Sequence, residues 1–196
     1  MNYPSINEVN EWFKNTTNFN LIKHCENCAF GAKLISERLN FLDPELAFIM
    51  GLIHDIGKLF NTNRYSHLII GYKFLLENGY DKIARICITH AFPIKTVFFE
   101  KNNFNNPEDY EFLKNYLYNI EYDDYDRLIQ LADCFSIPDG FCLIEKRFVQ
   151  ASLKYGTSNL TYRKWEKIIQ IKKYFEEKIN CSIYDILPNV VQNTFK

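Results

Sequence analysis

The stretch GLIHDIGKLF, residues 51–60, places a histidine and an aspartate side by side in an otherwise apolar run. Burying an imidazole and a carboxylate costs free energy unless partner groups satisfy them. A divalent cation would satisfy both, because imidazole nitrogens and carboxylate oxygens together suit ions such as iron, manganese, cobalt, nickel and zinc. His54 and Asp55 are therefore candidate ligands of the same metal ion.

The remaining histidines extend this pattern. The chain contains four histidines, His24, His54, His67 and His90. Each lies three, four or seven residues from apolar side chains, so each is expected on the inner face of a different helix. Asp133 likewise falls within an apolar segment, LIQLADCF. One inward histidine is usually a hydrogen-bonded core residue, but this combination favours a shared cationic centre in which Asp55 bridges two metal ions.

Helices are expected to position these residues. Ser5 and Glu8 have the spacing of a capping box that opens a first helix. Further helices are expected over 21–39, 43–54, 64–78, 80–90, from 106 onward, 122–136, after residue 140 to near Gly156, 162–178 and 182–185. Thr161 is expected to cap the helix over 162–178, and Pro138-Asp139-Gly140 predicts a turn. The sequence thus predicts an all-α protein, folded as one compact domain over 1–196.

The order of these residues resembles the H…HD…D signature of the HD superfamily of metal-dependent phosphohydrolases. HDIGK matches its HDIG subgroup, and the segments HLIIGYKFL and ICITH match the two additional histidines of its binuclear members. The resemblance implies a helical HD fold with a metal-site core at about 21–137. A C-terminal helical extension at about 139–196 lies outside the motif.

The resemblance also implies which residues hold two divalent metal ions. The ligands of the first would be His24, His54, Asp55 and Asp133, and those of the second would be His67, His90 and Asp55. Iron, manganese, cobalt, nickel and zinc are all compatible with these ligand types.

The function implied is hydrolysis of a phosphate ester or anhydride by a metal-activated hydroxide. The HDIG group includes small hydrolases similar to those that cleave diadenosine tetraphosphate, so we expect an enzyme that acts on a small phosphorylated substrate, a nucleotide or dinucleotide. HAFPIK, residues 90–95, stands where cyclic-dinucleotide phosphodiesterases carry a D-G-x-G-Y-P run, which disfavours that branch. A di-iron oxygenase and a non-catalytic signalling module of the same fold are the alternatives.

Four residues are candidates for catalysis or substrate binding. Asp55 would fix the separation of the metals and orient the hydroxide, and Lys58, one turn beyond, could steady a substrate phosphate. Arg64 and Arg147 are further candidates for phosphate contacts, although exposed surface charge is the simpler interpretation of both. The segment RKWEKIIQIKKYFEEK, residues 163–178, mixes cations and anions and is typical of a solvated amphipathic helix.

Composition restricts the other possibilities. A net charge of −1 disfavours binding to a nucleic acid polymer, and the longest apolar run, LAFIMGLI, is too short to span a membrane. The first residues contain no basic segment followed by an apolar one, so we expect a cytoplasmic protein. Its six cysteines should then be reduced. Cys25 and Cys28 are interpreted as buried thiols, and the sequence does not indicate an oligomeric state.

Overall fold

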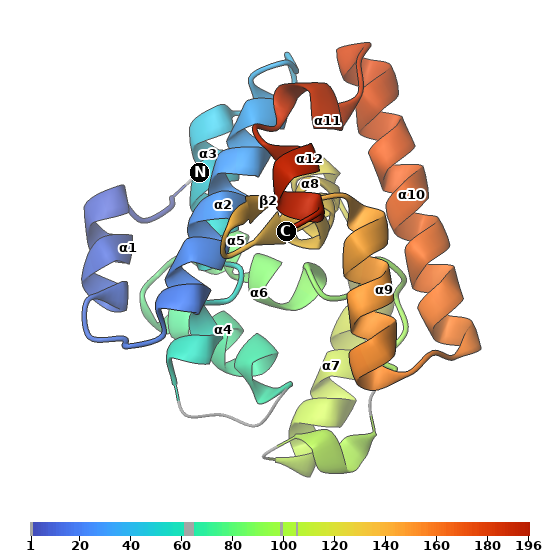
Figure 1. The fold of residues 1–196 in the computed structure, drawn as a ribbon. Helices are drawn as coiled ribbons and strands as arrows, with labels where there is room; N and C mark the ends of the chain where they lie inside the picture. Colours follow the sequence, from blue (N-terminus) through green and yellow to red (C-terminus); the bar gives the residue numbers. More distant parts are fainter. Residues whose placement is uncertain (1, 61–64, 99, 105) are drawn as a thin grey trace.

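The structure, a computed structural model, describes residues 2–60, 65–98, 100–104 and 106–196. Nearly all regular structure in these ranges is helical, which confirms the predicted all-α class (Figure 1). The α-helices are α1 (Ile6–Phe13), α2 (Phe19–Ser36), α3 (Pro44–Ile53), α4 (Ser66–Glu77), α5 (Asp81–Ala84), α6 (Ile86–Thr89), α7 (Pro107–Asn119), α8 (Asp124–Phe135), α9 (Ile144–Tyr155), α10 (Asn159–Ile179), α11 (Ile183–Ile186) and α12 (Val190–Thr194). Two 3-10 helices, η1 (Ile56–Leu59) and η2 (Lys101–Asn103), and a hairpin of β1 (Ser136–Ile137) and β2 (Gly140–Phe141) complete the elements.

The starts of α1 and α3 coincide with capping residues found in the sequence. Ser5 and Glu8 form the predicted capping box of α1, and the carboxylate of Asp43 accepts from the first backbone N–H groups of α3. The start of α10 differs from the prediction, because Ser158 is its N-cap and Thr161 is the third helical residue that completes a capping box. Satisfying two free backbone N–H groups at once favours this earlier start.

One other helix differs from its predicted form. The expected helix over 80–90 is divided into α5 and α6 at Arg85, an interruption that the apolar spacing alone does not reveal. The predicted turn at 138–140 is confirmed, and it connects the strands of a hairpin in which Ser136 pairs with Phe141.

Helices α2 and α3 pack closely because glycine stands at their contact. A Cβ atom on Gly51 would lie 2.4 Å from the Cα atom of Ala29, so the two backbones approach more closely than larger residues would allow. Cys25 and Cys28 of α2 are buried in the same hydrophobic cluster, as predicted. This contact brings the middle of α2 against the C-terminal half of α3.

A second close approach joins η1 to α4. A Cβ atom on Gly57 would lie 1.9 Å from the carbonyl oxygen of His67 and 2.7 Å from the amide nitrogen of Gly71. Only glycine can occupy this position, since both neighbouring atoms belong to the backbone. The turn after α3 is thereby held against the first half of α4.

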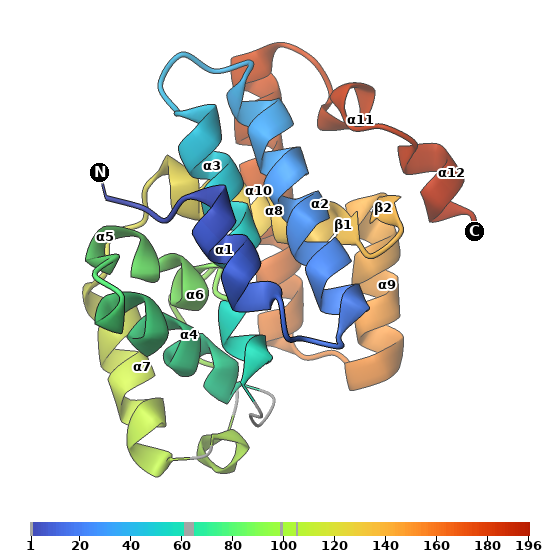
Figure 2. The same ribbon diagram turned by 90° about the vertical axis from the view of Figure 1, so that its left-hand side faces the viewer.

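The C-terminal extension covers the side of α2 and α3 that lies opposite α1 (Figures 1 and 2). Helix α10 packs on α8, and its buried residues Ile168, Ile171 and Phe175 belong to the main hydrophobic cluster. The spacing of these three residues confirms that α10 is amphipathic.

Within the described ranges, every helix is too short or too polar to cross a lipid bilayer.

Candidate metal centre

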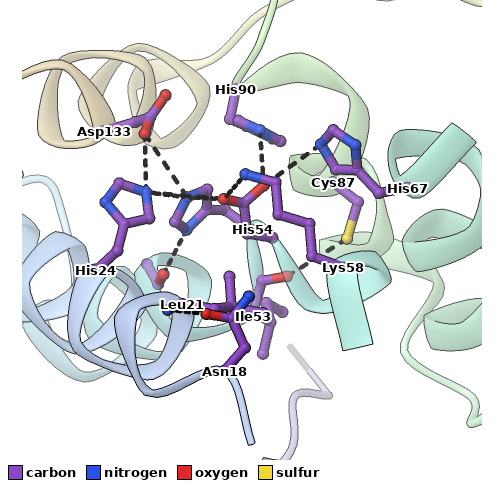
Figure 3. A network of polar contacts seen from close by, with 12 residues as sticks. Asn18, Leu21, His24, Ile53, His54, Lys58, His67, Cys87, His90 and Asp133 are labelled. Atoms are coloured by element: carbon purple, nitrogen blue, oxygen red, sulfur yellow. Dashed lines mark hydrogen bonds and ion pairs between the residues drawn. The ribbon is translucent and has the colours of Figure 1, made fainter. Parts of the chain in front are cut away.

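The structure brings the four histidines and both aspartates together between the helices (Figure 3). His24 lies in α2 and His67 in α4, while His54 and His90 are the C-cap residues of α3 and α6. Asp55 follows α3 directly, and Asp133 lies in α8. Their role as metal ligands stays a prediction, but their side chains are placed as that role requires.

One group of ligand atoms lies between α2, α3 and α8. The Nε2 atoms of His24 and His54 are 3.2 Å apart. Oδ2 of Asp55 lies 3.7 Å from Nε2 of His24 and 3.4 Å from Nε2 of His54. Oδ1 of Asp133 lies 3.0 Å and 3.8 Å from the same two nitrogens. The ligand atoms of His24, His54 and Asp55 lie close enough together to hold a metal ion, and Asp133 lies beside both histidines.

A second group lies on the other side of Asp55. Its Oδ1 atom is 3.4 Å from Nε2 of His67 and 3.5 Å from Nε2 of His90. These three residues also form a cluster that could hold a metal ion. The two oxygens of Asp55 therefore face two different histidine pairs, which is the arrangement expected of a bridging carboxylate.

Backbone carbonyl groups orient two of the imidazole rings. Nδ1–H of His54 donates to the carbonyl oxygen of Gly51 over 2.7 Å, and Nδ1–H of His90 donates to that of Ile86 over 2.9 Å. Because a carbonyl only accepts, these bonds place the proton on Nδ1 in the neutral ring. The lone pair of each Nε2 then points into the centre, as in histidines that bind metals.

Asp55 is buried and ionised. Burial raises its pKa, but the neighbouring His54 and Lys58 outweigh that effect and hold the pKa of Asp55 well below its ordinary value. The Lys58 ammonium group forms an ion pair with Oδ2. Oδ1 accepts no hydrogen bond from the described residues although it is fully buried. A buried carboxylate oxygen without a donor is costly, and a cation between it and the histidines would satisfy it.

His90 and Asp133 favour the protonation states that bind cations. Burial lowers the pKa of His54, but the neighbouring Cys28 and Asp55 outweigh that effect and hold this pKa well above its ordinary value, so a metal ion would displace a proton from His54. Burial lowers the pKa of His90, so its ring is neutral at physiological pH. Burial raises the pKa of Asp133, but its hydrogen bond to His24 and the charges of the nearby imidazoles outweigh that effect. The pKa of Asp133 is therefore lowered below its ordinary value, and this carboxyl is ionised. Neutral imidazole and ionised carboxylate are the forms in which these side chains coordinate metals.

A buried polar network fixes α6 relative to α8. Arg85 forms an ion pair with Asp126, and the Thr89 hydroxyl donates to Oδ1 of Asp126 over 2.6 Å. Nε2 of Gln130 donates to the carbonyl oxygen of Thr89 over 2.8 Å. These bonds connect the residues just before His90 to the helix that carries Asp133. The sequence analysis missed the network, although Asp126 lies seven residues before Asp133 and so on nearly the same helix face.

A pocket of about 580 Å³ opens beside the centre. His67, His90 and Asp133 are among the residues that line it, and so is Arg147 of α9. The predicted phosphate contact of Arg64 lies outside the described residues. Lys58 is placed against Asp55, and contacts of Lys58 or Arg147 with substrate stay predictions.

The pocket contains one cation that the sequence analysis did not single out. Lys164 of α10 lines it, in a segment interpreted as a solvated helix. The signal was its position four residues before Ile168 and seven before Ile171, both of which are buried. Lys164 therefore interrupts the apolar stripe of its helix, as the candidate metal ligands do on theirs.

Comparison with known proteins supports the same region. The family model described as HD domain matches residues 21–137, which include all six candidate ligands. No curated protein and no solved structure matches the chain.

Proposed function

We propose, from the premise that this chain belongs to the HD domain family, that it hydrolyses a phosphate ester or anhydride of a nucleotide or dinucleotide. The superfamily of this domain is of the metal-dependent phosphohydrolase type. The observation that carries the proposal is the placement of Asp55 between two histidine groups, with a buried Oδ1 atom that lacks a hydrogen-bond donor.

The ligand atoms fit two divalent ions. His24, His54 and Asp133 would hold the first, His67 and His90 the second, and Asp55 both. When bound, such ions supply a water whose pKa falls to about 7 and positive charge for the phosphoryl oxygens. Iron, manganese, cobalt, nickel and zinc all accept this set of nitrogen and oxygen ligands.

The chain itself contributes orientation and charge. The carbonyl groups of Gly51 and Ile86 keep the protons of His54 and His90 on Nδ1, away from the centre. The Lys58 ammonium group forms an ion pair with Asp55 and helps to keep this carboxylate ionised at neutral pH, so that both of its oxygens can coordinate. The exposed position of Lys58 leaves its ammonium group able to contact a substrate phosphate as well.

The pocket beside the centre supports a small substrate. Its volume of about 580 Å³ lies within the range of about 300–1,000 Å³ usual for sites that bind small molecules. The rings of Phe148 and Trp165 stack at 4.9 Å on its wall and could contact the organic part of a nucleotide.

The experiment measures metal content and hydrolysis together. Purified protein loaded with Mn²⁺, Fe²⁺ or Co²⁺ should cleave bis(p-nitrophenyl) phosphate or a member of a nucleotide panel. Asp55→Asn should lose metal and activity, whereas Asp139→Asn, a matched change at an exposed position, should keep both.

Two results would contradict the proposal. Metal-loaded protein that cleaves no phosphate compound would show that it is not a phosphohydrolase. A stable mixed-valent iron signal with substrate-dependent oxygen uptake would identify an oxygenase instead.

A further inference from the structure

The pocket is built largely by the part of the chain outside the family match. More than half of its lining residues belong to α9, α10 and the turn between them, within 147–168, whereas the family model ends at residue 137. The C-terminal extension therefore forms the wall that a substrate bound at the candidate metal centre would contact.

Two cations dominate the charge of this wall. Among the described residues that line the pocket, Arg147 and Lys164 carry positive charge and Asp133 is the one carboxylate. Neither cation forms an ion pair or a hydrogen bond with another described residue. The Lys164 ammonium group lies 3.8 Å from the centre of the Phe98 ring, which satisfies a cation only in part.

Both cations share a pocket with candidate metal ligands. Arg147 of α9 and Lys164 of α10 line the same cavity as His67, His90 and Asp133. Helices α9 and α10 both pack on α8, the helix that carries Asp133. The two cations therefore stand on the α9 and α10 side of a pocket whose lining includes three candidate ligands.

Holding an unpaired cation in a partly buried position is unfavourable without a bound anion. Burial lowers the pKa of Lys164 to about 8, so the amine is still mostly protonated at pH 7. A phosphate group would satisfy both side chains, because arginine can bind two phosphate oxygens at once and lysine acts as a point charge. The phosphate cleaved at the metal centre is attracted there by metal ions and does not need this second pair of cations.

We propose that Lys164 and Arg147 form a subsite for a second phosphate group, linked to the one that lies at the metal centre. The substrate then carries at least two linked phosphates, as a nucleoside diphosphate does, and a phosphate monoester is a poorer ligand. This inference rests on the proposed function, because the metal centre must hold the first phosphate.

The test compares two ligands that the protein cannot hydrolyse. Methylenediphosphonate has two phosphonate groups joined by carbon, and methylphosphonate has one. Calorimetric titration of metal-loaded protein, with metal content measured before and after, gives the affinity for each. Wild-type protein should prefer the diphosphonate by about tenfold or more.

Variants assign that preference to the subsite. Lys164→Met and Arg147→Met should each weaken diphosphonate binding about tenfold and change methylphosphonate binding less than about twofold. Lys173→Met is the matched control, because Lys173 lies nine residues along α10 on the opposite, exposed face. Lys164→Arg keeps the charge and should keep the preference, which separates a lost contact from misfolding.

Failure of the subsite can be told from failure of the proposed function. The subsite would be overturned if the wild-type protein showed no preference for the diphosphonate. It would also be overturned if the Lys164→Met and Arg147→Met variants bound the diphosphonate normally, or if they lost affinity for both ligands equally. Hydrolysis of bis(p-nitrophenyl) phosphate by wild-type protein in that case would leave the phosphohydrolase standing. Selective loss of diphosphonate binding in a protein that cleaves no phosphate compound would support the subsite and refute the hydrolase.

Discussion

Gly57→Ala tests whether the contact between η1 and α4 positions the second ligand group. The new Cβ atom would lie 1.9 Å from the carbonyl oxygen of His67, whereas real Cβ atoms keep at least 3.0 Å from such neighbours. The difference, 3.0 − 1.9 = 1.1 Å, must come from separating two backbones, because no side chain can rotate away. Overpacking of this kind costs about 3 kcal/mol, and for a chain of this length that lowers Tm by roughly 6–12 °C.

The same displacement should impair metal binding. Asp55 precedes η1 and His67 lies in α4, so their present separation of 3.4 Å between Oδ1 and Nε2 would change with the movement of the backbones. Metal–ligand distances tolerate changes of only about 0.2 Å. We expect the affinity for the second metal to fall by about tenfold or more, as it does when groups that orient ligands are lost.

Thermal unfolding in a chelator and metal titration of the same preparations provide the assay. The control is Gly79→Ala, where φ is +80° and no heavy atom lies within 4 Å of the added Cβ. Its left-handed backbone conformation costs about 1–2 kcal/mol, so its Tm should fall modestly and its metal affinity should not change. A Gly57→Ala protein with a Tm within about 2 °C of wild type and two metals bound normally would refute the close approach of η1 and α4.

Three further predictions follow from the same structure. Arg85→Met leaves the buried Asp126 carboxylate without its guanidinium partner and should lower the free energy of unfolding by about 3 kcal/mol at pH 7. Burial already raises the pKa of Asp126, so protonation of this carboxylate should recover part of the lost stability between pH 7 and pH 5. Urea unfolding that gives equal losses at both pH values would contradict this prediction. Burial lowers the pKa of Lys164 to about 8, so its reaction rate with an amine-reactive ester, followed by peptide mass spectrometry, should level off above pH 8, whereas a lysine in an unstructured peptide keeps gaining reactivity to about pH 10. Removing a metal present at about 100 times its Kd should cost about 2.7 kcal/mol and lower Tm by roughly 5–11 °C; a Tm that chelator and added Mn²⁺ leave unchanged would show that the two clusters do not hold metal.

The sequence predicted the helices because their signals are local. Apolar residues at helical spacing mark the inner face of α2, and Asp43 before Pro44 marks the start of α3. The same spacing placed all four histidines on inner faces, so their meeting in the core could be expected before any tertiary contact was known. Where a competing local interaction decided the outcome, as at the cap of α10, the prediction was off by a few residues.

Contacts between distant segments could not be predicted in this way. Gly57 follows the helix predicted over 43–54, and only its packing on α4 shows why a larger residue cannot replace it. Lys164 reads as one charge among many in its helix, and only the packing of α10 on α8 places it in the pocket beside Asp133.

The sequence by itself determined which side chains point inward, because that depends on the 3.6-residue period of each helix. The tertiary structure alone decided that the two oxygens of Asp55 face separate histidine pairs and that Arg147 and Lys164 share one pocket. These relations depend on the distances and angles between helices, and those are set by glycine contacts and buried hydrogen bonds that join residues far apart in the chain.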